Sequence, residues 1–186
     1  MKLWINLVYD GSIEWNTVLS HLETIPPTDI FVASNSSVVS DGNHTVHNQI
    51  INISAGLDSH VRALHRNSVE MFKQSLSGLD CTHCYCVSAS ALIRGELPIK
   101  QILANPIETN FLNSPTRYSY DNYIGDLPTA SRLSNIWRFI ESIDYTVQQN
   151  YYLKSFEKEQ NMEFESWLWR FWVENQNIKY RWTAWE

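Results

Sequence analysis

Three carboxylates stand at positions where an acid or a base could act on a ligand. Asp10 directly follows the apolar segment 3–9, and open α/β sheets bind ligands beyond the carboxyl ends of such strands. Asp121 lies in a polar segment that ends at Gly125, where an ionisable side chain would be accessible. Glu165 lies near the start of an aromatic segment, 162–175. Asp121 also suits a turn, and Glu165 also suits the first turn of a helix.

The cysteines lie together in the segment 81–86, CTHCYC, which also contains His83. Thiolate and imidazole are the usual ligands of structural zinc. However, no second ligand pair follows elsewhere in the sequence, and alternation on a strand would place His83 on the face opposite Cys84 and Cys86. We therefore interpret the cysteines as small buried hydrophobes.

The familiar short motifs of catalysis are missing from the sequence. It contains no HExxH, no phosphate-binding loop, no GxSxG and no GxGxxG, and the histidines are scattered. The sequence thus lacks the minimum residues of the hydrolase, kinase and dehydrogenase classes that these motifs mark.

Tryptophan is the unusual component, with 8 residues concentrated towards the end of the chain. In the segment 165–175, ESWLWRFWVEN, helical spacing places Leu168 and Trp172 on the inward face. Trp169 lies on a different face, and Trp182 or Trp185 follows in the last segment. These side chains could form a platform for a sugar ring or a base.

The elements that would position these residues begin with a strand, a helix and a second strand. The apolar segments 3–9 and 29–34 predict buried strands, and a stripe between them predicts a helix that Ser12 caps and Pro26-Pro27 ends. This order is typical of an α/β sheet. The stripe consists of Trp15, Val18, Leu19 and Leu22.

The middle of the chain predicts a polar loop over 35–47, an apolar strand or loop over 49–53, and then a helix. Leu57, Val61, Leu64 and Ser68 recur at helical spacing after Gly56, and Gly78 marks the end of that helix. The remaining predictions are a central strand at 82–93, a short helix at 98–104, a loop at 105–123, helices at 128–143 and 162–175, and an edge strand at 178–185.

Bulk properties limit the classes of protein. A chain of 186 residues fits one domain, and the net charge of -6 disfavours non-specific binding to nucleic acids. No apolar run approaches the roughly 20 residues of a membrane span. The first residues suit a strand better than a secretion signal, which predicts a cytoplasmic location. We expect one α/β domain over 1–186, with a mostly parallel central sheet and an aromatic C-terminal helix.

Five short segments carry a family resemblance: 48–50 (NQI), 55–57 (AGL), 64–68 (LHRNS), 120–125 (YDNYIG) and 163–169 (EFESWLW). Taken in order, they resemble the small bacterial glycosyltransferases of the WavE type, which act in lipopolysaccharide and capsule synthesis. The resemblance implies a Rossmann-like, glycosyltransferase A-type fold and a nucleotide-sugar donor. It also implies a divalent metal, Mn or Mg, held by an acidic pair against the donor diphosphate.

The resemblance assigns roles to several residues. Asp121 or Glu165 would act as the general base on an acceptor hydroxyl, and Trp169 and Arg170 would bind the acceptor. The family has a carboxylate in the stretch that aligns with Arg66-Asn67-Ser68, and none is present here, so the usual acidic metal motif is not evident and Asn67 would be a weak oxygen ligand at best. Arg66 would then neutralise the diphosphate, or the chain would have lost activity. The donor-binding residues would be Tyr9, Asp10, Asn48, Gln49, Arg66 and Asn67.

The sequence leaves two acceptor classes open, and it leaves open whether the protein is an active enzyme. The family indicates a growing glycan, whereas the Asn/Ser/Thr-rich character of the chain is found in small viral proteins. Phage enzymes that glycosylate hydroxymethylated DNA bases are thus a second acceptor class, which would place the protein in the host cytoplasm. Arg170, Lys179 and Arg181 would supply the phosphate contacts. A different class is a catalytically inactive interaction protein that keeps the fold.

Overall fold

The computed structural model describes residues 2–53, 57–76, 78, 81–95, 97–104, 109–115, 122–132 and 177–182. The helices are α1 (Trp15–Leu22), α2 (Leu57–Leu76), α3 (Ala89–Arg94) and α4 (Ile99–Ala104). The strands are β1 (Leu3–Tyr9), β2 (Asp29–Ser34), β3 (Thr45–Ile50), β4 (His83–Ser88), β5 (Phe111–Ser114), β6 (Asn122–Asp126) and β7 (Lys179–Trp182). Residues 127–132 are also helical.

The described strands form one sheet in the order β3-β2-β1-β4-β6-β5-β7. β1, β2, β3 and β4 run parallel, and β7 runs parallel to β5. β6 is antiparallel to both of its neighbours, β4 and β5. The predicted α/β class with a mostly parallel central sheet is therefore confirmed, and the reversal at β6 is an addition that periodicity did not predict.

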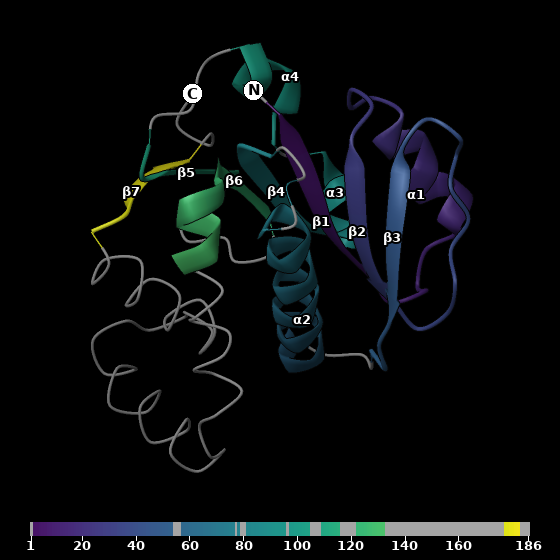
Figure 1. Cartoon of the computed structure of the whole chain (residues 1–186). Coiled ribbons are helices and arrows are strands. Elements are labelled where there is room, and N and C mark those ends of the chain that lie inside the picture. The colour runs from purple at the N-terminus through teal and green to yellow at the C-terminus, as the bar shows by residue number, and fades with distance from the viewer. Residues whose placement is uncertain are drawn as a thin grey trace, which may run out of the picture.

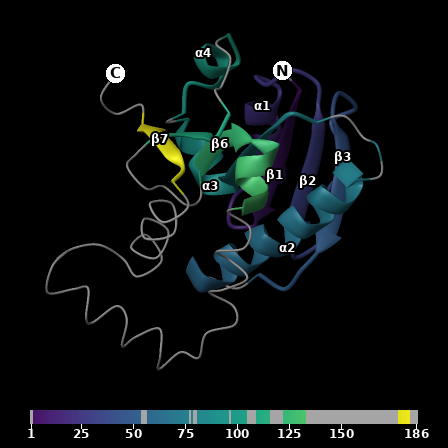
Figure 2. The same cartoon turned by 60° about the vertical axis from the view of Figure 1, so that its left-hand side comes forward.

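Helices cover both faces of the parallel part of the sheet (Figure 1). Ala63, Leu64 and Met71 of α2 join one core with the inward side chains of one face, and Val18 and Leu22 of α1 join a second core on the other. α3 contributes to the second core, and Figure 2 shows α2 lying across the face opposite α1 and α3. All seven residues of β1 are buried, as expected for a strand covered on both faces.

Several predicted elements are confirmed. The strands at 3–9 and 29–34, the helix of the Trp15–Leu22 stripe, the helix from Leu57 and the short helix within 98–104 all occur. The C-terminal strand lies at the end of the sheet as β7, which confirms the predicted edge strand. The predicted helix at 128–143 is described only as far as residue 132, and the predicted aromatic helix at 162–175 lies outside the described residues.

Four local predictions need correction. Ser12 does not cap α1, because the N-cap is Glu14 without a side-chain bond and Ser12 binds Asp10 instead. The loop predicted at 35–47 and the run at 49–53 are divided differently, since β3 already begins at Thr45 and ends at Ile50. The strand predicted at 82–93 ends at Ser88, and α3 follows directly. The predicted loop at 105–123 contains β5 and the start of β6.

Candidate functional site

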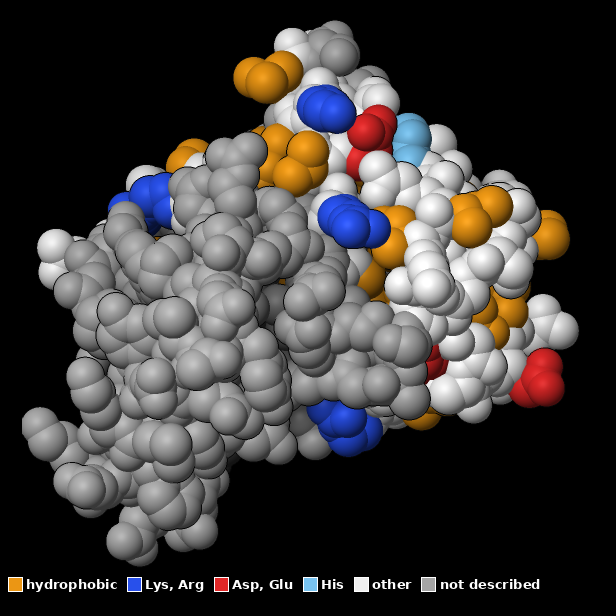
Figure 3. Space-filling view, turned by 90° about the horizontal axis from the view of Figure 1, so that it is seen from below, with side chains coloured by type: hydrophobic (Ala, Val, Ile, Leu, Met, Phe, Trp, Pro, Cys, Tyr) orange, Lys and Arg blue, Asp and Glu red, His pale blue; other side chains and the backbone are white. Residues whose placement is uncertain are grey.

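The carboxyl edge of the parallel strands is the part of the fold that suits a ligand. β1 lies between β2 and β4, so the chain moves to one side of β1 through β2 and β3 and then crosses to the other side with β4. Loops that leave in opposite directions open a crevice at such a switch point, and open α/β sheets bind ligands there. Figure 3 views the molecule from the side towards which β1, β2 and β3 run in Figure 1; its described part is mostly uncharged, with isolated charged groups.

The turn after β1 is built by Asp10. Its Oδ1 accepts hydrogen bonds from the Ser12 backbone N–H at 2.9 Å and from the Ser12 hydroxyl at 2.6 Å. Gly11 has φ +83°, a conformation that glycine adopts without steric cost. Asp10 is partly exposed at this edge, as its position after an apolar strand predicted.

Tyr9 supports this turn from beneath. Its side chain is buried, its O–H donates to the Ile13 carbonyl at 2.5 Å, and its ring centroid lies 5.0 Å from that of Trp15. Burial raises the pKa of Tyr9, and the negative charges of Glu14 and Asp10 raise it further. Tyr9 is therefore a protonated donor that fixes the turn, and its hydroxyl is used inside the protein.

Asn35, directly after β2, ties the edge together. Its Nδ2 donates to the Asp10 carbonyl at 3.1 Å and to the Ile53 carbonyl at 2.9 Å, and its Oδ1 accepts from the Ile53 N–H at 2.6 Å. One side chain thus joins the segments that follow β1, β2 and β3. Sequence reasoning missed this residue, although an asparagine directly after a buried apolar strand is a signal of the same kind as Asp10.

The end of β4 adds hydroxyls to the edge. The Ser88 Oγ accepts from the Ala91 N–H at 3.2 Å, which caps α3, and lies 3.2 Å from the Ser90 Oγ. Ser88 is buried and Ser90 is exposed. Both were missed because the segment was predicted as one continuous strand. β6 begins beside this point, with Asn122 paired to Val87.

Asn48 and Gln49 lie further from the edge, on β3. The Asn48 Nδ2 donates to the Ser34 Oγ at 2.8 Å and to the Val32 carbonyl at 3.1 Å, and its Oδ1 accepts from the Val38 N–H at 3.1 Å. The amide of Asn48 therefore holds the loop that follows β2. Gln49 is partly exposed and pairs with Ala33.

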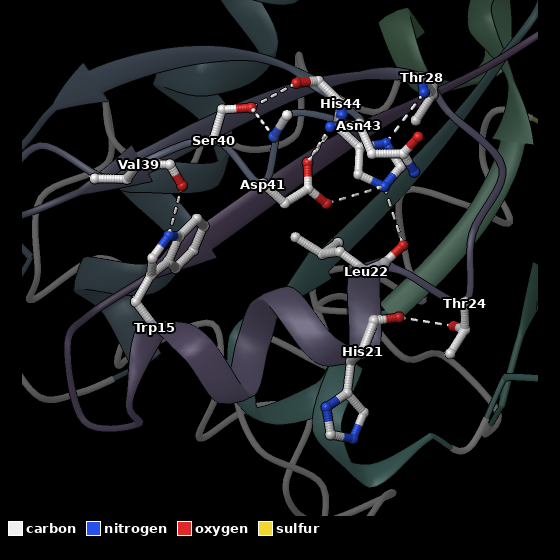
Figure 4. A network of polar contacts seen from close by, with 11 residues as sticks. Trp15, His21, Leu22, Thr24, Thr28, Val39, Ser40, Asp41, Asn43 and His44 are labelled. Atoms are coloured by element: carbon white, nitrogen blue, oxygen red, sulfur yellow. Dashed lines mark hydrogen bonds and ion pairs between the residues drawn. The ribbon is translucent and has the colours of Figure 1, made fainter.

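The same loop is anchored a second time through His44 (Figure 4). The ring Nδ1 accepts from the Thr28 N–H at 3.1 Å, so the proton lies on Nε2, which is 3.1 Å from the Leu22 carbonyl. The Asp41 Oδ1 accepts from the Asn43 and His44 N–H groups at 2.8 and 2.9 Å. Burial acts to raise the pKa of Asp41, but the hydrogen bonds from these backbone N–H groups and the electrostatic effect of the nearby His44 ring outweigh it and lower the pKa.

Asn67 is not brought to the edge. Asn67 is 1% exposed, and its Nδ2 donates to the Asn6 Oδ1 at 2.6 Å and also to the Phe31 carbonyl. The Asn6 Nδ2 in turn donates to the Ser68 Oγ at 2.7 Å, so a polar network joins α2 to β1 inside the core. Arg66 is exposed beside it. Asn67 also reaches the Leu7 carbonyl, three residues or about 10 Å along β1 from Asp10.

The other predicted site residues, Asp121, Glu165, Trp169 and Arg170, lie outside the described residues. Asp121 directly precedes Asn122, the first residue of β6, in the sequence. Two hollows of about 480 and 400 Å³ lie elsewhere in the described structure, lined in part by Lys2, Trp4 and Asp29 and by His21, Tyr85 and Leu97 respectively. Neither contains a residue of the carboxyl edge.

Two of the three cysteines are buried as the sequence predicted, whereas Cys81 is only partly buried. Cys84 and Cys86 are buried, with their Sγ atoms 3.4 Å apart, and the Cys84 Sγ lies 3.4 Å from the Met71 Sδ. The hydrogen bond with Cys86 and the burial of the thiol raise the pKa of Cys84 well above its usual value. Within the described ranges no group of three or more His, Cys, Asp or Glu side chains could hold a metal ion.

No helix among the described residues combines the length and the apolar character needed to cross a membrane. No protein-family model matches the sequence, and no curated protein matches it.

Proposed function

We propose that the protein is a glycosyltransferase that moves a sugar from a nucleotide-sugar donor to an acceptor hydroxyl. The observation that carries the proposal is the set of polar turns at the carboxyl edge on both sides of the β1–β4 switch point. A mostly parallel sheet with one reversed strand is compatible with a Rossmann-like domain, and we propose the glycosyltransferase A-type variant.

The donor nucleoside would bind beside Asp10. A carboxylate there repels a phosphate and accepts hydrogen bonds from hydroxyl or N–H groups, so it suits the ribose or the base rather than the diphosphate. Tyr9, Asn48 and Asn35 would act by shaping the turns, since their polar atoms hydrogen-bond within the protein. The nucleoside therefore lies over the β1 side of the switch point in this proposal.

The described end of β4 does not fit the acidic pair that would hold a divalent metal. Ser88 and Ser90 occupy it, and the Ser88 hydroxyl caps α3. Neutral hydroxyls alone are weak ligands for Mg or Mn compared with carboxylates. We therefore assign no catalytic step to a metal. Arg66 is exposed on α2 next to Asn67, and it stays the proposed contact of the diphosphate in place of a metal.

The chemical step needs a base on the acceptor hydroxyl, and we assign this role to Asp121, with Glu165 as the second candidate. Asp121 precedes Asn122, which lies opposite Val87 at the end of β4. A base must come within about 3 Å of the proton that it takes, or act through one water. Trp169 and Arg170 stay the proposed acceptor contacts. With a net charge of -6, a glycan acceptor is favoured over modified DNA.

A thermal-shift screen with nucleoside diphosphates and nucleotide sugars tests the proposal. A ligand at a hundredfold excess over its dissociation constant stabilises the folded state by about 2.7 kcal/mol. Asp10→Asn should weaken the binding of the ligand that gives the shift at least tenfold. Asp29→Asn is the matched control, because Asp29 begins β2 at the opposite edge of the sheet. No shift with any nucleotide would favour the interaction-protein alternative.

A further inference from the structure

Asn122, the first residue of β6, has a buried side chain that the fold does not use. Its exposed fraction is 1%, and within the described structure neither Nδ2 nor Oδ1 has a hydrogen-bond partner. A buried polar group without a partner loses its hydration and gains nothing in return, so it destabilises the folded state. Such a group in a native protein needs an explanation, and a bound ligand is one of the few available.

Other asparagines of this protein show what a structural role looks like. Asn6 donates from Nδ2 to Ser68 and accepts at Oδ1 from Asn67. Asn35 and Asn48 also use both ends of the amide, to join the loops at the carboxyl edge. Asn122 differs from all of these, because both of its amide ends are unused.

The position of Asn122 places its amide beside the switch point. β6 is antiparallel to β4, so it begins where β4 ends, and Asn122 pairs with Val87, which pairs in turn with Leu7 of β1. Adjacent strands lie about 4.8 Å apart, so Asn122 is about 10 Å from β1 across the sheet. Ile124 belongs to the core under α1 and α3, and strand alternation directs Asn122 to the same face.

We propose that Asn122 binds the sugar of the substrate, with Oδ1 accepting from one hydroxyl and Nδ2 donating to its neighbour. This inference rests on the proposed function. A neutral amide carries no positive charge to bind a diphosphate. Two adjacent sugar hydroxyls, in contrast, can donate to Oδ1 and accept from Nδ2, the two atoms of Asn122 that have no partner. With the nucleoside over β1, the β4–β6 side takes the sugar end of the donor. The same diol chemistry in an acceptor glycan would satisfy the amide equally.

Replacement by leucine, which has a similar size, separates a ligand-binding amide from a structural one. Asn122→Leu removes an unpaired amide, so the unfolding temperature should rise by about 3 °C or more. Asn6→Leu is the matched control, because the same change there breaks paired bonds and should lower the unfolding temperature. If the unfolding temperature of Asn122→Leu decreased as it does in Asn6→Leu, ordered water or another group would already form hydrogen bonds with the Asn122 amide, and the inference would be overturned.

Calorimetric titrations of the wild type and Asn122→Leu complete the test. They use the nucleotide sugar that gives the thermal shift, the same nucleoside diphosphate without its sugar, and the free acceptor saccharide. The variant should bind the nucleotide sugar, or the saccharide, at least tenfold more weakly, with nucleoside diphosphate affinity within twofold of wild type. Loss for the nucleotide sugar identifies the donor, and loss for the saccharide identifies the acceptor.

Other outcomes separate this inference from the proposed function. Unchanged binding of both sugars, or an equal loss for the nucleoside diphosphate, would overturn the role of Asn122 while leaving a nucleotide site. If no nucleotide binds the wild type, the proposed function fails. The sugar site then stands only if a free saccharide binds the wild type and not the variant, and otherwise falls as well.

Discussion

The polar network between α2 and β1 gives a stability prediction that the structure makes quantitative. The Asn67 Nδ2 donates to the Asn6 Oδ1 at 2.6 Å and to the Phe31 carbonyl, and the residue is 1% exposed. Asn67→Ala removes the donor and leaves buried acceptors without it. Each orphaned buried group costs about 1–3 kcal/mol, and the lost packing adds to this cost.

Two effects oppose that loss. The Asn67 Oδ1 has no partner in the described structure, so its removal relieves a penalty, and alanine has a higher helix propensity than asparagine. We expect a net loss of about 3 kcal/mol in the free energy of unfolding. For a chain of 186 residues this corresponds to a decrease of about 9 °C in the unfolding temperature.

Urea denaturation followed by far-UV circular dichroism measures this loss. Arg66→Ala is the control on the same helix, since Arg66 is exposed and should change the stability by no more than about 0.5 kcal/mol. If the free energy of unfolding of Asn67→Ala were within about 1 kcal/mol of that of Arg66→Ala, the buried network would not hold α2 on the sheet, and the reasoning would be refuted.

Three further predictions concern other parts of the fold. Gly125→Ala would place a Cβ 2.8 Å from the Leu112 Cδ2 and 3.3 Å from the Phe111 carbonyl, so overpacking between β5 and β6 should cost about 1–3 kcal/mol in urea; equal stability would contradict that close approach. The pKa of Asp41 in the folded protein lies below its ordinary value of 3.8, so the ionised carboxylate stabilises the folded state. The stability of the wild type relative to Asp41→Asn should therefore be greatest above pH 3.8 and should be lost as the pH falls through the lower folded pKa. Urea midpoints of both proteins at several pH values measure this difference, and a difference that grows below pH 3.8 would contradict the lowered pKa. Cys84 should resist alkylation by iodoacetamide in the native protein, because the Cys86 hydrogen bond and burial raise the pKa of its thiol. Mass spectrometry measures the alkylation, and rapid alkylation of Cys84 would show that solvent reaches this part of the core.

The parts of the fold that sequence predicted are those where local pattern and tertiary burial agree. β1 and β2 are continuous apolar runs because both faces of the sheet are covered, and α2 shows its inward stripe directly. β3 was assigned mostly to a loop because TVHNQI is polar, and its pairing with β2 is a long-range property. The apolar run after His83 gave no sign of where strand becomes helix, since a short run of this kind suits both.

In the candidate site, too, local sequence pattern predicted some residues, whereas others come together only through tertiary pairing. Asp10 was found because a carboxylate after an apolar strand marks the strand's carboxyl end. Ser88 and Asn122 become neighbours only through the pairing of β4 with β6, which no local pattern encodes. Asn67 had a signal that was not used: with Leu64, Ser68 and Met71 it completes an i, i+3, i+4, i+7 stripe, which predicts a core position rather than a ligand contact.

The location of the nucleotide sugar on the fold is the most direct test of the account. Amide chemical shifts of the ¹⁵N-labelled protein, titrated with the nucleotide sugar that raises the unfolding temperature, report this location. We expect the largest changes at Asp10, Gly11, Asn35, Ser90 and Asn122, around the β1–β4 switch point. Changes confined to the hollow near Lys2 and Asp29 at the amino-terminal edge, or no saturable changes at all, would contradict a donor site at the carboxyl edge.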